Sequence, residues 1–277
     1  MRYPKAPWFL SILAMGLLTS ASAWHSAPIE VDLALVLAVD VSTSMDPDEQ
    51  NLQRQGYVEA FRSAMVHQAV HKGTVGRIAV TYVEWAGAHP RFQNVVVPWT
   101  ILEKPKDSIT FAERLAHAPI YRMAGTSISE AIAFSLSLFS SGHFLAARRV
   151  IDISGDGSNN QGALVTEARD MAIAQGVTIN GLPIALRDPD QRENATLDAY
   201  YRDCVIGGPN AFMIPVRARG QFLIETRAKI VREIAGGPEP AQPVRKVTQT
   251  DCDTSESLWD DPGPDPHTPR HNAGQSL

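Results

Sequence analysis

Oxygen-bearing side chains stand at alternate positions near the start of the sequence, at Asp40, Ser42 and Ser44. One carboxylate and two hydroxyls, with no cysteine or histidine in the same segment, suit a hard divalent cation rather than zinc or copper. The sequence therefore indicates a metal site whose ligands are all oxygen atoms.

The same three residues have a simpler interpretation as turn or helix-capping residues. A cap is available further on, however. Asp46 fits the N-cap, Pro47 the first helical position and Glu49 the third, which together form a capping box. With that cap in place, the helix does not need the three residues upstream, and a ligand role is the better interpretation.

Two other segments carry residues of the same chemistry. Thr126 precedes a predicted helix that Ser127 and Glu130 can cap, so its hydroxyl is not needed there. Asp156 lies between two glycines at the end of a predicted strand, where it would also be ordinary as a turn residue. Because open α/β sheets bind ligands outside the carboxyl ends of their strands, we expect all three loops to meet at one edge of a sheet.

The element that positions the first loop is the apolar run over residues 31–39, which is too short to cross a bilayer. Such a run is typical of a strand buried on both faces of a parallel sheet. The following strands alternate with helices, except that the connection 84–92 is too short for a helix. We therefore expect an α/β fold: a doubly wound, mostly parallel six-stranded sheet with one antiparallel edge strand and helices on both faces. The predicted strands cover residues 31–39, 76–84, 92–99, 149–154, 178–185 and 211–216, and the predicted helices 47–71, 107–116, 128–141, 164–175, 194–204 and 221–235.

The first 23 residues are typical of a signal peptide that is cleaved. They contain the positive residues Arg2 and Lys5, an apolar stretch, and the small-residue site Ala21-Ser22-Ala23. We expect an exported protein, secreted or periplasmic, with no membrane span in the mature chain.

The rest of the chain divides into a predicted domain over residues 24–235 and a proline-rich extension over residues 236–277. The extension has few apolar residues, and we expect it to be disordered after about residue 253. The formal charge of −5 includes interspersed charges of both signs, with no basic stripe of the kind that binds nucleic acid.

Cys204 and Cys252 are the only cysteines. Export to an oxidising compartment favours a disulfide between them, which would tie the extension to the domain. Two free buried thiols are the alternative.

The five oxygen-bearing positions resemble the metal-ion-dependent adhesion site of the von Willebrand factor type A (vWFA) domain. The pattern of that site is D-x-S-x-S, then a Thr, then an Asp. Asp40, Ser42 and Ser44 match the first element, Thr126 the second and Asp156 the third, so every position is filled. The likeness covers roughly residues 31–235, and within the superfamily the chain resembles a group of secreted bacterial proteins of unknown function.

The resemblance implies roles for these residues. Ser42, Ser44 and Thr126 would contact the cation through neutral hydroxyls, and the two aspartates would act mainly through water, or one of them directly. Mg²⁺ fits a small site that retains waters, while Ca²⁺ or Mn²⁺ is compatible with the same ligands. An open coordination position would accept a carboxylate from a partner protein.

Two functions are consistent with this pattern. The first is an exported, metal-dependent protein-binding module that is not an enzyme. The second is a metal-dependent phosphohydrolase of haloacid-dehalogenase-like type, which also begins with an Asp after a buried strand. Those enzymes place a second Asp two residues later as general acid and base, and here that position is Ser42. The missing acid–base pair favours the binding module.

Overall fold

The computed structural model describes residues 27–186, 191–236 and Cys252. The predicted signal peptide and the predicted disorder after residue 253 lie outside these residues. No helix within the described ranges is long and apolar enough to cross a membrane.

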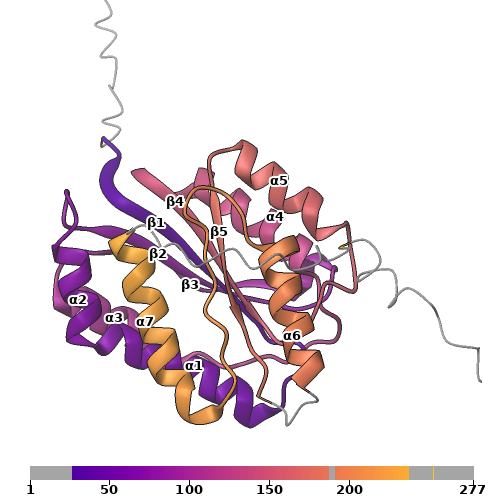
Figure 1. Cartoon of the computed structure of the whole chain (residues 1–277). Helices are drawn as coiled ribbons and strands as arrows, with labels where there is room; N and C mark the ends of the chain where they lie inside the picture. The colour runs from indigo at the N-terminus through magenta and orange to yellow at the C-terminus, as the bar shows by residue number, and fades with distance from the viewer. Residues whose placement is uncertain (1–26, 187–190, 237–251, 253–277) are drawn as a thin grey trace, which may run out of the picture.

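A five-stranded sheet with the order β3-β2-β1-β4-β5 forms the centre of the structure (Figure 1). β1 pairs in parallel with β2 and β4, β4 pairs in parallel with β5, and β3 is the antiparallel edge strand beside β2. The predicted α/β architecture with one antiparallel edge strand is therefore confirmed. The strands are β1 (Ile29–Asp40), β2 (Ile78–Trp85), β3 (Gln93–Leu102), β4 (Phe144–Gly155) and β5 (Thr178–Pro183).

β1 lies in the middle of the sheet, which explains why its sequence is apolar at almost every position. Alternate side chains point to opposite faces, so Leu33, Leu35 and Leu37 enter one core while Ala34 and Val36 enter the other. The strand then ends at Asp40, where the chain turns into the first loop of the candidate site.

Helices cover both faces of the sheet (Figure 1). One core is shared with α1 (Pro47–Arg62), α2 (Ala64–His71), α3 (Pro105–His117) and α7 (Phe222–Ala235). The other is shared with α4 (Ile128–Leu138), α5 (Val165–Ala174) and one π-helical turn, η3 (Tyr201–Val205), which continues α6 (Gln191–Tyr200).

The predicted sixth strand is wrong: residues 211–216 make only two isolated bridges, from Met213 to Gly181 of β5 and from Val216 to Ile184 directly after β5. The hydrogen bonds show why. Ile214 N donates to Gly181 O at 3.1 Å and Val216 N donates to Pro183 O at 2.9 Å. The bond between them in a parallel ladder would need an N–H on Pro183, which proline lacks. The ladder is therefore interrupted, and no continuous strand forms.

The helix predicted over residues 47–71 is divided at Ser63. That residue adopts an extended conformation and ends α1, and its hydroxyl accepts a hydrogen bond from Val66 N, which starts α2. Serine is a favourable cap because its side chain competes for backbone groups in this way.

Candidate metal centre

Three loops meet at the carboxyl edge of the sheet, as the sequence predicted. Met123 N donates to Val41 O at 3.2 Å, and Thr43 N donates to Met123 O at 2.9 Å, so the loop before α4 lies along the loop after β1. On its other side, the loop before α4 is bonded to the loop after β4. Thr126 N donates to Asn160 Oδ1 at 2.9 Å, and Asn160 N donates to Thr126 O at 2.8 Å.

Four of the five predicted ligand residues form a continuous chain of hydrogen bonds. Asp40 Oδ1 accepts from Ser42 N at 2.7 Å, the hydroxyls of Ser42 and Ser44 are 2.6 Å apart, and Ser44 Oγ donates to Asp156 Oδ1 at 2.6 Å. Ser44 and Asp156 are 112 positions apart in the sequence, so this bond depends on the fold and not on local turn geometry.

Thr126, the fifth residue, lies in the loop between the other two and is 5 % exposed. Its backbone N–H and C=O are both bonded to Asn160, which fixes the position of the residue. Among the residues that the structure describes, no hydrogen bond uses the Thr126 hydroxyl, so helix capping does not consume it.

The predicted capping residues act as caps, which separates them from the candidate ligands. Asp46 and Glu49 form the complete capping box of α1: Asp46 Oδ1 accepts from Glu49 N at 2.7 Å, and Glu49 Oε2 accepts from Asp46 N at 2.9 Å. Ser127 Oγ accepts from Glu130 N at the start of α4. The helices therefore do not use the side chains of the five candidate ligands as caps.

Asp40 has an unfavourable environment for a carboxylate. It is completely buried, and its Oδ2 has no hydrogen-bond partner within the described part of the chain. Burial raises the pKa of Asp40 to about 8, and the charge of nearby Asp156 adds to this, while hydrogen bonds from Ser42 oppose it. A cation beside Asp40 would supply the positive charge that the described side chains do not.

The set is unlike a metal site built from acids and histidines. No group of three or more His, Cys, Asp or Glu that could hold a metal occurs among the described residues. The candidate site has only two carboxylates, and its remaining oxygens belong to hydroxyls. Such a donor set fits a hard cation that keeps part of its water shell.

Arg122 and the asparagines after Asp156 are part of the site, although the sequence did not identify them. Exposed Arg122 donates from Nη2 to Thr43 O at 3.2 Å and to Met45 O, the two carbonyls that flank Ser44. Asn159 Oδ1 accepts from Ser129 N at 3.1 Å, beside the loop that Asn160 holds. A run of Gly, Ser and Asn signals a structured loop, but nothing in the sequence shows what such a loop bonds to.

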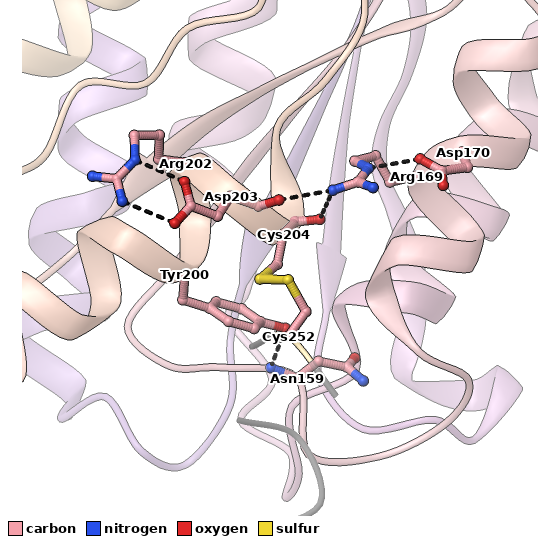
Figure 2. Close-up of a disulfide and its surroundings, with 8 residues drawn as sticks. All are labelled: Asn159, Arg169, Asp170, Tyr200, Arg202, Asp203, Cys204 and Cys252. Atoms are coloured by element: carbon pink, nitrogen blue, oxygen red, sulfur yellow. Dashed lines mark hydrogen bonds and ion pairs between the residues drawn. A yellow bond between two sulfur atoms is a disulfide. The ribbon is translucent and has the colours of Figure 1, made fainter. Parts of the chain in front are cut away.

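The disulfide predicted between Cys204 and Cys252 is present, with the two Cα atoms 5.8 Å apart. Figure 2 shows it beside Tyr200, whose hydroxyl accepts a hydrogen bond from Asn159 N at 3.1 Å. The last residue of α6, directly before the π-helical turn that carries Cys204, is thus bonded to a loop of the candidate site.

A model of the family described as "Protein of unknown function (DUF1194)" matches residues 30–238. No curated protein matches the sequence.

Several solved structures share the fold. One is proximal thread matrix protein 1 from the mussel byssus, with zinc in its metal-ion-dependent adhesion site (MIDAS) motif. It is 13 % identical with a TM-score of 0.51, over 75 % of this chain and 49 % of that one. A von Willebrand factor type A protein from Catenulispora acidiphila is 15 % identical with a TM-score of 0.50, over 74 % and 43 %. The pilus adhesin SpaC from Lactobacillus rhamnosus GG is 11 % identical with a TM-score of 0.54, over 76 % and 31 %.

These comparisons confirm the vWFA fold that the sequence pattern indicated. The chain spans less than half the length of each of the three solved structures. Identities this low concern the fold alone, so the site must be interpreted from its own residues.

Proposed function

We propose that this chain, which belongs to the DUF1194 family of proteins of unknown function, is a divalent-cation-dependent protein-binding module of the adhesion type. The hydroxyls of Ser42, Ser44 and Thr126 and the carboxylates of Asp40 and Asp156 would hold the cation. Once bound, a cation such as Mg²⁺ would supply the positive charge to which a carboxylate of the partner protein binds.

The observation that carries this proposal is the hydrogen-bonded chain from Asp40 through Ser42 and Ser44 to Asp156. It gathers four oxygen-bearing side chains from two distant loops around a buried carboxyl that has no cationic partner among the described residues. Ser44 is exposed, so the chain of hydroxyls leads from the buried Asp40 to solvent, where a partner can approach.

The positive charge of Arg122 supports a partner that presents a carboxylate. The guanidinium lies against the backbone on both sides of Ser44 and uses only Nη2 for those two bonds. A guanidinium has five N–H donors and pairs well with carboxylates. We propose that Arg122 contacts the same acidic side chain of the partner, or one beside it.

Catalysis is the less favoured function. The residue two positions after Asp40 is Ser42, whose hydroxyl is bonded to Ser44, so no second carboxylate stands where a phosphohydrolase of the haloacid-dehalogenase type has its acid and base. Lys229, a buried cation of the same domain, is paired with Asp152 and Glu233 on the opposite face of the sheet from Asp40.

The proteins of similar fold agree with a binding role, since one is a pilus adhesin and another has a zinc-occupied MIDAS motif. We further propose that the protein acts outside the cytoplasm, because the N-terminal sequence resembles a signal peptide and the Cys204–Cys252 disulfide requires an oxidising compartment to persist.

The test is capture of partner proteins from the extracellular and periplasmic fractions of the source organism by immobilised protein, with Mg²⁺ and with a chelator. Ser42→Ala removes one candidate ligand and should lose the captured proteins that the chelator also removes. Ser140→Ala, an exposed serine after α4, is the matched control and should behave as wild type.

Identical capture by wild type and Ser42→Ala, with and without chelator, would overturn the proposal. Hydrolysis of a phosphate ester that requires Mg²⁺ and disappears in Asp40→Asn would favour the enzyme instead.

A further inference from the structure

A second buried polar group, the hydroxyl of Tyr201, lies near Asp40. Both residues are completely buried. Neither Asp40 Oδ2 nor the Tyr201 hydroxyl has a hydrogen-bond partner among the described residues. Burying two polar atoms of this kind unpaired is costly, whereas pairing them removes the cost.

Gly155 lies next to both groups, and its lack of a side chain leaves room for them. A Cβ at Gly155 would lie 3.0 Å from Asp40 Oδ2 and 3.0 Å from the Tyr201 hydroxyl oxygen. The two oxygens are therefore no farther apart than twice that distance. The side chain of any larger residue at this position would crowd both oxygens.

A second glycine admits the aromatic ring itself. A Cβ at Gly181 would lie 2.8 Å from Cδ1 of Tyr201, well inside normal contact distance. Gly155 ends β4 and Gly181 lies in β5, and both continue the alternation of Ile153 and Ile179, which enter the core on the side of η3. Because neither glycine has a side chain, Tyr201 can pack against the two neighbouring strands with its hydroxyl near Asp40.

The turn that carries Tyr201 is fixed from several directions. Cys204 ties η3 to Cys252, and Arg169 donates to the carbonyl oxygens of Asp203 and Cys204, each at 3.0 Å (Figure 2). Ile206 N donates to Tyr201 O at 2.9 Å. An aromatic side chain mounted on such a turn has little freedom to move away from Asp40.

We propose that Tyr201 is a positioning residue of the candidate metal centre. Its hydroxyl and Asp40 Oδ2 are both unbonded within the described part of the chain, and a small local adjustment would bring them together so that the hydroxyl donates a hydrogen bond to Oδ2. With Oδ1 held by Ser42 N, this second bond fixes the plane of the carboxylate. A tyrosine hydroxyl carries its proton at neutral pH and is suited to donate it. Residues that orient metal ligands from outside typically change metal affinity 10–100-fold when removed. The inference rests on the proposed function, since it assigns a role within the same cation site.

The experiment compares Mn²⁺ binding, followed by calorimetry or by the electron paramagnetic resonance of free Mn²⁺, in wild type, Tyr201→Phe and Tyr57→Phe. Tyr57 is the matched control, because it is also completely buried with an unpaired hydroxyl but belongs to α1, in the core on the other face of the sheet. Tyr201→Phe should weaken Mn²⁺ binding about tenfold or more, while Tyr57→Phe should leave it unchanged.

A double-mutant cycle in chelator tests the contact itself. The losses of stability in Tyr201→Phe and Asp40→Ala should be non-additive, because each variant removes the same hydrogen bond. Additive losses, or equal Mn²⁺ affinity in wild type and Tyr201→Phe, would overturn the role of Tyr201 and leave the metal centre standing. Absence of Mn²⁺ binding by wild type would overturn the proposed function itself, and this inference with it.

Discussion

Asp40 is a completely buried carboxyl at the candidate metal centre. Its burial would be unfavourable in a protein that had no use for it, because an ionised carboxyl without a counter-charge is costly to bury. The raised pKa of Asp40, to about 8, follows first from that burial and then from the charge of Asp156. A pKa shift of this kind is characteristic of functional sites, where a carboxyl that is costly to bury is retained because it binds a ligand.

Cation binding should therefore depend on pH. Below about pH 8 the carboxyl of cation-free Asp40 holds a proton that a cation must displace, so affinity should fall as pH falls, by up to about tenfold per pH unit. Mn²⁺ titrations between about pH 6 and pH 9 measure this. In Asp40→Asn the weaker binding should be nearly independent of pH, and a flat profile in wild type would contradict the expectation.

The candidate ligands could be proposed from the sequence, whereas the residues that support them could not. The spacing of Asp40, Ser42 and Ser44 is local, and a strand followed by a helix cap leaves few other uses for it. Tyr201 gave no such signal, because a tyrosine within a predicted helix looks like any other core residue. Its proximity to Asp40 depends on which strands are neighbours and on glycines at the crossing point.

At the scale of elements, α7 is held to the sheet by a buried ionic cluster as well as by apolar packing. Lys229 Nζ lies 2.5 Å from Asp152 Oδ1 on β4 and 2.6 Å from Glu233 Oε1, and Asn180 Nδ2 donates to Glu233 Oε2 at 2.6 Å. All three charged side chains are almost completely buried. Removing the lysine would leave two carboxylates without a cation.

Lys229→Met should consequently lower the free energy of unfolding by about 3–5 kcal/mol, measured by urea denaturation. Burial raises the pKa of Asp152 to about 6 even though Lys229 lowers it, so in the variant Asp152 should take up a proton readily. The loss should be largest near pH 8 and smaller near pH 5, because a protonated Asp152 is less costly to bury. The half-buried Arg227 of the same helix provides the control Arg227→Met; an equal loss there would contradict the cluster's role.

Helices and strands were predicted correctly where the hydrophobic pattern was strong. The prediction failed where pairing depended on a single backbone N–H of another element. The apolar run of β1 and the periodicity of α4 and α7 required no knowledge of their neighbours. The segment 211–216 looked like a strand on its own, and it failed because Pro183, in a different element, lacks the N–H that pairing needs. The sequence of a segment alone cannot show whether the strand beside it can pair with it.

At the scale of the whole molecule, the Cys204–Cys252 disulfide joins positions separated by 48 residues. It holds the π-helical turn that carries Tyr201 and follows Tyr200 of α6, so the bond would support the candidate metal centre. Cross-linking a loop of this length constrains the unfolded chain and is worth ~4 kcal/mol on the chain-entropy model.

Replacing both cysteines with alanine should lower the free energy of unfolding by ~4 kcal/mol, measured by urea denaturation. Wild type treated with a reductant serves as the second arm and should approach the same value. An unchanged midpoint in both arms would show that the disulfide does not constrain the described domain.

The course of β1 has a mechanical consequence. The strand begins at Ile29, at the edge of the sheet opposite the candidate metal centre, and ends at Asp40. Force between a partner held at that centre and the start of the domain would act along the length of this one strand. β1 is bonded on both sides, to β2 and to β4, so the load would fall on two parallel ladders in shear. Pulling the strand out would require breaking many hydrogen bonds together, which would suit the adhesion-type role proposed above.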